Sequence, residues 1–163
     1  MNKSVSFFSD KVLEECNYLL KRFPENKKRS AVIEVLKIVK KENGGYLNEE
    51  LIEKVANYLG ISKISAYEVA SFYSMFDLTP VGKYKICICV SISCMLCGSD
   101  NIVEYVKNKL GINFGETTLD GKFTLKKVEC LAICGSAPVM QIDEKCYENL
   151  TNEKIDLVLD NLE

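Results

Sequence analysis

The stretch "KYKICICVSISCMLCGSD", residues 83–100, decides the fold of the C-terminal half of this chain. In residues 83–90 the side chains alternate between two faces, with Tyr84, Ile86, Ile88 and Val90 on one and Lys85, Cys87 and Cys89 on the other. A period of two residues predicts a strand, here one in the middle of a sheet. Three cysteines then fall within the nine positions from 89 to 97. The sequence therefore places thiols where this strand passes into a loop.

The elements after this loop predict a small sheet covered by helices. We expect a helix capped by Ser99 or Asp100 and ending at Gly111, strands at 122–129 and 139–143, and a last helix capped by Thr151. The order strand, helix, strand, strand, helix fits helices packed on a small mixed sheet. A thioredoxin-like α/β fold is the natural candidate for that order.

The N-terminal half has the apolar period of helices instead. Helices are predicted from Ser9 or Asp10 to before Pro24, from Ser30 to Gly44, from Asn48 to Gly60, and from about Ser62 to Phe76. Near Thr79 the spacing of the apolar residues changes from that of a helix to the alternation of a strand. We therefore predict an α+β protein, with a helical bundle in residues 1–79 and a thioredoxin-like domain in residues 80–163.

The composition excludes several classes of protein. Of the 163 residues 47% are apolar and 27% charged, a soluble globular balance. Lys and Arg number 12 against 11 acidic residues in 1–79, and 9 against 12 in 80–163, so the halves carry +1 and −3 and neither suggests nucleic acid. No apolar run approaches the ~20 residues of a membrane span. The apolar stretch in the first residues, "MNKSVSFFSD", is too short for the core of a signal peptide. We therefore expect a cytoplasmic protein without direct membrane insertion.

Eight cysteines and no histidine restrict the chemistry further. In a reducing compartment disulfides are rare, and clustered cysteines favour metal or redox chemistry. The absence of histidine excludes Cys₂His₂ zinc sites, Rieske centres and Cys–His nucleophiles. Any metal site must therefore be built from thiolates.

Three groupings of the cysteines compete. Cys89, Cys94 and Cys97 with one distant cysteine match the plant-type [2Fe–2S] spacing. Cys94 and Cys97 alone form a redox C-x-x-C, as in thioredoxin. The third grouping joins Cys89 and Cys94 to Cys130 and Cys134 and leaves Cys97 aside.

Only the third grouping uses both downstream cysteines. Its two pairs lie in loops that would share one end of the sheet, so four thiolates could converge there. Soft thiolates suit an iron–sulfur cluster. A structural Cys₄ zinc site stays open on spacing alone, although zinc sites prefer C-x-x-C on both sides.

At these residues the chain resembles a known family, the thioredoxin-like [2Fe–2S] subunit of respiratory complex I (NADH:quinone oxidoreductase). The resemblance covers about residues 30–163 and follows these blocks in order: "VASFYSMF" (69–76), "PVGKYKI" (80–86), "CMLCGSD" (94–100), "ETTLDGKFTL" (116–125) and "VECLAICGSAPVMQID" (128–143). It implies that Cys89, Cys94, Cys130 and Cys134 bind a [2Fe–2S] cluster. Where this chain has Cys97 and Ala132, the family usually has a non-cysteine residue and glycine.

The resemblance also implies a function. Such a subunit of NADH dehydrogenase would exchange single electrons with the flavin of the NADH-oxidising subunit, in the peripheral arm on the inner face of the cell membrane. The helical part would dock on that flavin- and NADH-binding partner, beside other peripheral-arm subunits. The chain has no G-x-G-x-x-G after a strand and no other substrate site that we can identify. The equivalent subunit of a soluble NAD-linked hydrogenase or formate dehydrogenase is the alternative, and a thiol–disulfide or zinc module a remote one.

Overall fold

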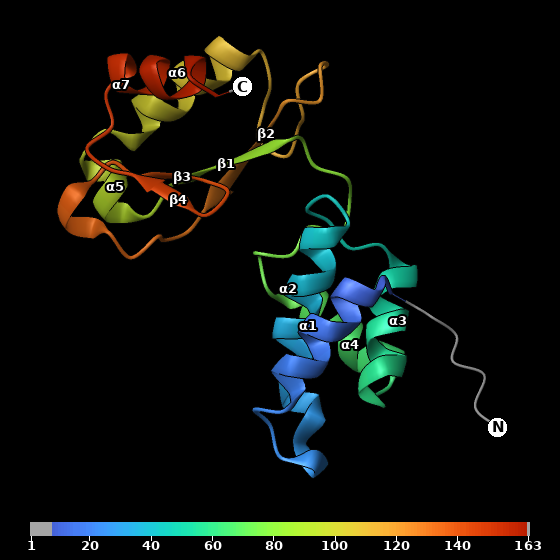
Figure 1. Cartoon of the computed structure of the whole chain (residues 1–163). Coiled ribbons are helices and arrows are strands. Elements are labelled where there is room, and N and C mark those ends of the chain that lie inside the picture. Colours follow the sequence, from blue (N-terminus) through green and yellow to red (C-terminus); the bar gives the residue numbers. More distant parts are fainter. Residues whose placement is uncertain (1–7, 163) are drawn as a thin grey trace. The chain divides into compact units, whose positions relative to one another are not determined.

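The computed structural model describes residues 8–162 (Figure 1). Its contacts divide the chain into two compact units, one ending at Pro80 and one beginning at Val81. We call them the helical unit and the sheet unit and describe each by itself. The prediction that the chain start is no signal peptide rests mainly on residues 1–7, which lie outside the described residues.

The helical unit consists of helices, three of which begin at a predicted side-chain cap. They are α1 (Asp10–Leu20), the short 3₁₀ segment η1 (Glu25–Ala31), α2 (Val32–Glu42), α3 (Glu49–Leu59) and α4 (Lys63–Phe72). The side chains of Ser9, Asn48 and Ser62 each accept a hydrogen bond from a backbone N–H in the first turn of the helix that follows. The predicted starts of α1, α3 and α4 are thereby confirmed.

Two other boundaries differ from the prediction. Ser30 does not cap α2, because it lies within η1 and the helix begins after Ala31. The fourth helix ends at Phe72 rather than Phe76, where Tyr73 turns to an extended conformation. Beyond that turn Asp77 is buried, and its carboxylate lies 3.3 Å from Nζ of Lys40 on α2. Tertiary contacts of this kind override helix propensity.

The core of the helical unit is apolar and contains the isolated cysteine of α1. Its largest fully buried side chains are Val35, Leu36, Val39, Leu47, Ile52 and Val55. Cys16 has no exposed surface, as predicted for a core residue. Burial and, to a smaller extent, the charge of Glu15 raise the pKa of its thiol to about 11. Cys16 is therefore a packing residue.

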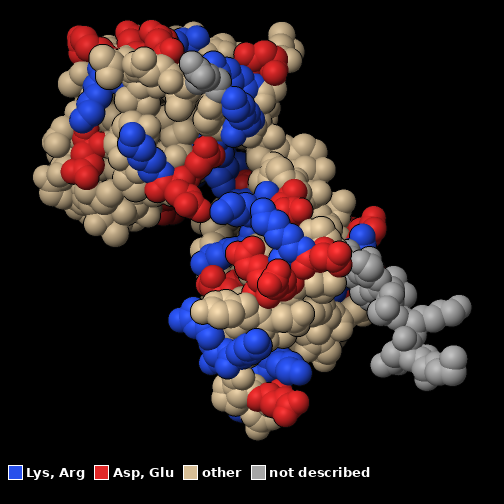
Figure 2. Space-filling view, viewed as in Figure 1, with Lys and Arg blue, Asp and Glu red and all other residues tan. Residues whose placement is uncertain are grey.

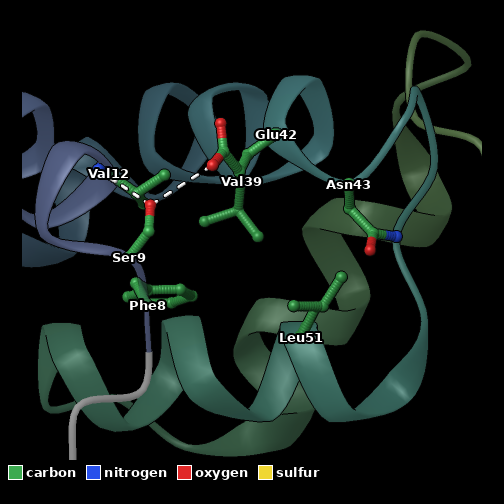
Figure 3. A pocket seen from close by; sticks show the side chains of 7 residues that line it. All are labelled: Phe8, Ser9, Val12, Val39, Glu42, Asn43 and Leu51. Carbon is green, nitrogen blue, oxygen red and sulfur yellow. Dashed lines mark hydrogen bonds between the residues drawn. The ribbon is translucent and has the colours of Figure 1, made fainter.

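A small pocket lies between α1, α2 and α3 (Figure 3). Its volume is about 160 Å³, below the 300–1,000 Å³ typical of ligand sites. The hydroxyl of Ser9 donates to the carboxylate of Glu42 at 3.2 Å at its rim, while Val12, Val39 and Leu51 form an apolar wall. The pocket is smaller than a typical substrate site.

The sheet unit is a four-stranded mixed sheet with two long helices. Its elements are β1 (Tyr84–Cys89), α5 (Ile92–Leu96), α6 (Ser99–Leu110), β2 (Phe123–Val128), the 3₁₀ turn η2 (Cys134–Ser136), β3 (Met140–Ile142), β4 (Lys145–Tyr147) and α7 (Asn152–Asp160). The strand order is β2-β1-β3-β4. Strand β1 runs parallel to β2 and antiparallel to β3, and β3 and β4 are antiparallel (Figure 1). The predicted α+β class, small mixed sheet and inner position of the first strand are confirmed.

The alternation in β1 separates the core from the cysteines. Ile86 and Ile88 are fully buried in a core that includes Val106 of α6 and Ile155 of α7. The next residue along, Cys89, is buried in a separate cluster at the end of the strand. Each face of β1 thus serves a different purpose, as the period of two residues predicts.

Three short elements of the sheet unit were not predicted. Helix α5 and the 3₁₀ turn η2 lie in cysteine-containing segments that we expected to be loops, and β4 follows the turn at Asp143. Helix α6 is preceded by Gly98 at φ 90°, without a side-chain cap. The prediction that Ser99 or Asp100 caps this helix is therefore wrong, because both residues lie inside it. The Oγ of Ser99 is buried without a hydrogen-bond partner. Among residues 8–162 no helix combines the length and the apolar character that crossing a membrane requires.

Candidate metal centre

Parallel pairing of β1 and β2 brings the two cysteine pairs to one end of the sheet. Cys89, the last residue of β1, lies opposite Val128, the last residue of β2. Parallel strands end at the same sheet edge, so the segments that leave them start side by side. The prediction that both loops share one end is confirmed. The backbone also joins them, since the N–H of Val90 donates to the carbonyl of Val128 at 2.9 Å.

Cys89 and Cys94 form the buried half of the site. Each is 2% exposed, and Cys94 lies in the middle of α5. Burial raises the pKa of Cys94 to about 11; the hydrogen bond to the thiol of Cys89 raises it further, while a hydrogen bond with the backbone of Val139 opposes the shift. The thiol of Cys89 donates to the carbonyl of Glu129 at 3.7 Å. The two thiols are therefore in contact, beside the residue that precedes Cys130.

Cys130 and Cys134 form the exposed half. Both are exposed to solvent, and Cys134 begins η2. Cys134 lies near enough to Cys94 for its charge to raise the pKa of that thiol, as a lesser contribution. The backbone N–H of Ala132 donates to Sγ of Cys130 at 3.3 Å. One pair of thiols is thus held inside, and the other opens toward solvent.

Ala132 adopts a backbone conformation that favours glycine. Its φ is 60°, in the left-handed region where a Cβ meets the following carbonyl. This is the position at which the resembling family usually has glycine, and the conformation gives the physical reason. In this chain Ala132 therefore strains the backbone of the segment from Cys130 to Cys134.

An apolar wall surrounds the buried thiols. Cys89, Cys94 and Val139 form a buried cluster, against which Val128, Leu131, Ile133 and Ala137 pack. Between Ala137 and Pro138 the peptide bond is cis. The wall separates the inner thiols from water, which strengthens electrostatic interactions within the site.

The sheet unit contains three further cysteines, outside the two pairs. Cys97 is exposed at the C-terminal cap of α5. Cys87 is 8% exposed and pairs with Lys126 and Gln141 in the sheet, and Cys146 is exposed on β4. In the part of the chain from residue 8 to 162, no three cysteine, aspartate or glutamate side chains are grouped closely enough to hold a single metal ion, and this includes the candidate ligands Cys89, Cys94, Cys130 and Cys134.

Sequence reasoning missed some features of the site. Helix α5, which carries Cys94, has too few residues to show a helical period. The buried hydroxyl of Ser99 carries no sequence signal, because serine before a helix ordinarily predicts a cap. The strained Ala132 could be found only by comparison with the glycine of related sequences.

The donor set fits an iron–sulfur cluster. All candidate ligands are thiols, soft ligands that match iron and sulfide, and the chain contains no histidine. Two iron atoms need two pairs of thiolates, and the chain supplies one pair from β1 and α5 and another from the segment after β2.

Comparison with known proteins agrees with this geometry. The model of the thioredoxin-like [2Fe–2S] ferredoxin family matches residues 16–163. The chain belongs to this family. As a thioredoxin-like [2Fe–2S] ferredoxin it has a family cofactor, the [2Fe–2S] cluster, that its thiols fit.

Relatives of this ferredoxin match it over nearly its whole length. It is 45% identical over 156 residues to an NADH-quinone oxidoreductase subunit of Rickettsia conorii, covering 96% of this chain and 93% of the relative. It is 41% identical to the mitochondrial NADH dehydrogenase [ubiquinone] flavoprotein 2 of Dictyostelium discoideum, of which it covers 63%.

A solved structure with the same fold is that of an NAD⁺-reducing [NiFe]-hydrogenase in the air-oxidised state. The TM-score is 0.69 at 17% identity, over 85% of this chain. The ferredoxin spans about a quarter of that hydrogenase chain, namely 24%. At this identity the likeness shows the fold alone.

Proposed function

We propose that this ferredoxin is the electron-transfer subunit of an NADH-quinone oxidoreductase, respiratory complex I. The observation that carries the proposal is the pair of thiol segments at one end of the sheet, in a chain 45% identical to a subunit of such an enzyme. It is an oxidoreductase as part of that assembly. Two hollows of the described residues lie in the helical unit, the small one beside Ser9 and an open one of about 560 Å³ along α4 lined by Glu68, Val69, Ser71, Phe72 and Tyr73, and neither contains any of the candidate cysteines.

Cys89, Cys94, Cys130 and Cys134 would hold the cluster. When bound, a [2Fe–2S] cluster supplies a centre that takes up and releases one electron at a time. The four ligands come from two segments anchored to adjacent parallel strands, so the sheet fixes their separation.

The remaining residues of the site position the ligands and exclude water. The wall of Val128, Leu131, Ile133, Ala137 and Val139 keeps solvent from the inner pair. The N–H of Ala132 donates to the sulfur of Cys130, and donors to a ligand sulfur tune the reduction potential of a cluster. The exposed pair, Cys130 and Cys134, marks the side from which an electron partner approaches.

The partner we propose is the flavin- and NADH-binding subunit, with which the chain exchanges single electrons. The helical unit supplies the docking surface. Exposed apolar side chains gather along α4 and the turn after it: Ile64, Tyr67, Phe72, Tyr73, Met75 and Leu78. Exposed aromatic residues and methionine are typical of protein interfaces.

Charge does not point to another kind of partner. Each unit shows both basic and acidic side chains on the face drawn in Figure 2, which argues against nucleic acid. We place the chain in the peripheral arm, on the inner face of the cell membrane, among the other subunits of that arm.

The test is a metal and spectroscopic analysis of the full chain purified without oxygen. We expect about two irons and two sulfides per chain and a one-electron EPR signal on reduction, as a [2Fe–2S] cluster requires. One zinc per chain and no colour would refute the proposal. Purification from its own cells then identifies the parent complex: a quinone-reducing assembly supports complex I, whereas hydrogen or formate oxidation supports a soluble NAD-linked enzyme.

A further inference from the structure

One exposed thiol of α5 lies outside the proposed ligand set. Cys97 is exposed at the C-terminal cap of α5, whereas Cys94 of the same helix is 2% exposed. Cys94 in turn is in hydrogen-bond contact with Cys89. Three thiols therefore follow one another from solvent into the apolar interior.

The backbone holds Cys97 one turn after Cys94. The N–H of Cys97 donates to the carbonyl of Cys94 at 3.1 Å and to that of Ser93 at 3.3 Å. Residues three apart on a helix have Cβ atoms about 5–6 Å from each other. A disulfide needs about 3.5–4.5 Å between Cβ atoms.

The shift that joins these thiols is small, and the end of α5 permits it. Cys97 has φ −92° and ψ 13°, outside the regular helix, and α5 has only 5 residues. The next residue is Gly98, at φ 90°, so the chain turns freely there. The residues that would have to move to join the pair therefore lie in α5 and at Gly98, before the first residue of α6.

We propose that Cys94 and Cys97 form a reversible disulfide whenever the site holds no cluster. The proposal rests on the proposed function, because it treats Cys94 as a cluster ligand that is occupied in the loaded protein. The site then has two exclusive states, with Cys94 bound either to iron or to Cys97.

The reaction needs a small disulfide such as oxidised glutathione as its oxidant. The thiolate of Cys97 attacks one sulfur of that disulfide, so a mixed disulfide forms and one glutathione leaves as thiolate. The thiol of Cys94 then gives up its proton as its sulfur attacks the sulfur of Cys97, and the second glutathione leaves. The two protein thiols lose two electrons and two protons in total, and oxidised glutathione becomes two reduced molecules.

The disulfide would protect Cys94, a proposed cluster ligand, from irreversible oxidation. A thiol held in a disulfide is withheld from irreversible oxidation to sulfinic acid, and a reductant restores it. Cys94 is 2% exposed and in hydrogen-bond contact with Cys89, so an oxidised Cys94 would place added oxygen atoms beside a second proposed ligand.

The experiment compares full-length protein with its cluster and after removal of the cluster by a chelator. Both samples are treated with oxidised glutathione and digested without reductant, and the peptides are mapped by mass spectrometry. We expect a Cys94–Cys97 disulfide in the cluster-free sample, and Cys97 as a mixed disulfide in the loaded one. Cys146, exposed on β4, is the internal control and should remain a mixed disulfide in both.

A variant tests the protective role. After oxidised glutathione, then peroxide and then dithiothreitol, cluster-free wild type should rebuild its cluster with iron and sulfide to nearly the untreated yield. Cys97→Ser, treated alike, should recover several-fold less. Both proteins should rebuild equally without peroxide, which shows that Cys97→Ser folds.

Two results would overturn the proposal. One is a Cys89–Cys94 disulfide, or no internal disulfide, in the cluster-free wild type. The other is the Cys94–Cys97 disulfide at equal yield with and without the cluster. Failure of the proposed function is separate, because it shows in the iron and sulfide content of the untreated protein.

Discussion

Ala132 is the residue at which this chain departs from good local geometry beside its ligands. Its φ of 60° costs an alanine about 1 kcal/mol relative to glycine. Glycine also gives the unfolded chain more freedom, which offsets part of this gain. We therefore expect Ala132→Gly to raise the free energy of unfolding by less than about 1 kcal/mol, measured by urea denaturation of the cluster-free full chain.

Ala137 offers the matched control in the same segment. Its φ is −65°, an ordinary extended conformation, and its methyl group packs on the apolar wall. Ala137→Gly should therefore lower the free energy of unfolding by about 1 kcal/mol. If both variants change the free energy of unfolding in the same direction, the backbone of Ala132 is not strained.

Replacing different cysteines by serine should affect the cluster differently. Cys94→Ser or Cys130→Ser should lose the cluster or leave it labile, because serine is a poorer ligand for iron. Cys97→Ser should keep it, since that thiol lies at the cap of α5, outside the ligand set. Iron and sulfide content and the visible spectrum measure the outcome. Loss of the cluster in Cys97→Ser with a harmless Cys134→Ser would restore the plant-type grouping.

At the scale of elements, β1 carries both the core and the site. Ile88 is fully buried between the sheet and the helices, and Ile92, four residues on, is 67% exposed on α5. Ile88→Ala should cost about 3 kcal/mol of unfolding free energy. Ile92→Ala, the same chemical change, should cost less than about 0.5 kcal/mol. If thermal or urea unfolding gives the two variants similar costs, Ile88 does not contribute to the core as its burial indicates.

The turn after α4 depends on a buried charge. Asp77 is 1% exposed and pairs with Lys40, whose Nζ also donates to the carbonyl of Met75 at 2.6 Å. Lys40→Met should therefore destabilise the protein by about 3 kcal/mol, since it removes a partner of a buried carboxylate.

The control for that variant is an exposed pair on the same helix. Lys37 pairs with Glu34 at 2.9 Å, and both side chains are nearly half exposed. Lys37→Met should change the unfolding free energy by less than about 1 kcal/mol. If urea denaturation gives the two variants the same cost, the Lys40–Asp77 pair does not anchor the turn.

The predictable and unpredictable elements differ in length and in what holds them. Side-chain caps at Ser9, Asn48 and Ser62 mark helix starts because the signal is local. The strand β4 has 3 residues and α5 has 5, so neither shows a period, and both are held by tertiary contacts. The candidate ligands were found because thiols are rare and their spacing is conspicuous, whereas the buried state of Cys94 and the strain at Ala132 depend on the folded backbone.

At the scale of the whole molecule, each unit has its own core. The sheet unit begins at Val81, and Gly82 is part of it: its N–H donates to Oγ1 of Thr124 at 2.6 Å, and a Cβ there would meet the backbone of Gly121 and Lys122 at 3.0 Å. A fragment of residues 81–163 should therefore fold and keep the cluster. Its iron content and circular dichroism test this.

The same division predicts where partner binding is lost. If the helical unit docks on the flavin-bearing subunit, the fragment of residues 81–163 should no longer capture that subunit, whereas the full chain should. Within the full chain, Phe72→Ala should weaken capture several-fold, because Phe72 is 81% exposed amid the apolar side chains after α4. Tyr18→Ala, on α1 and 72% exposed, should not. Undiminished capture by the fragment would place the docking surface in the sheet unit, where the electron partner would meet the exposed Cys130 and Cys134 without help from the helices.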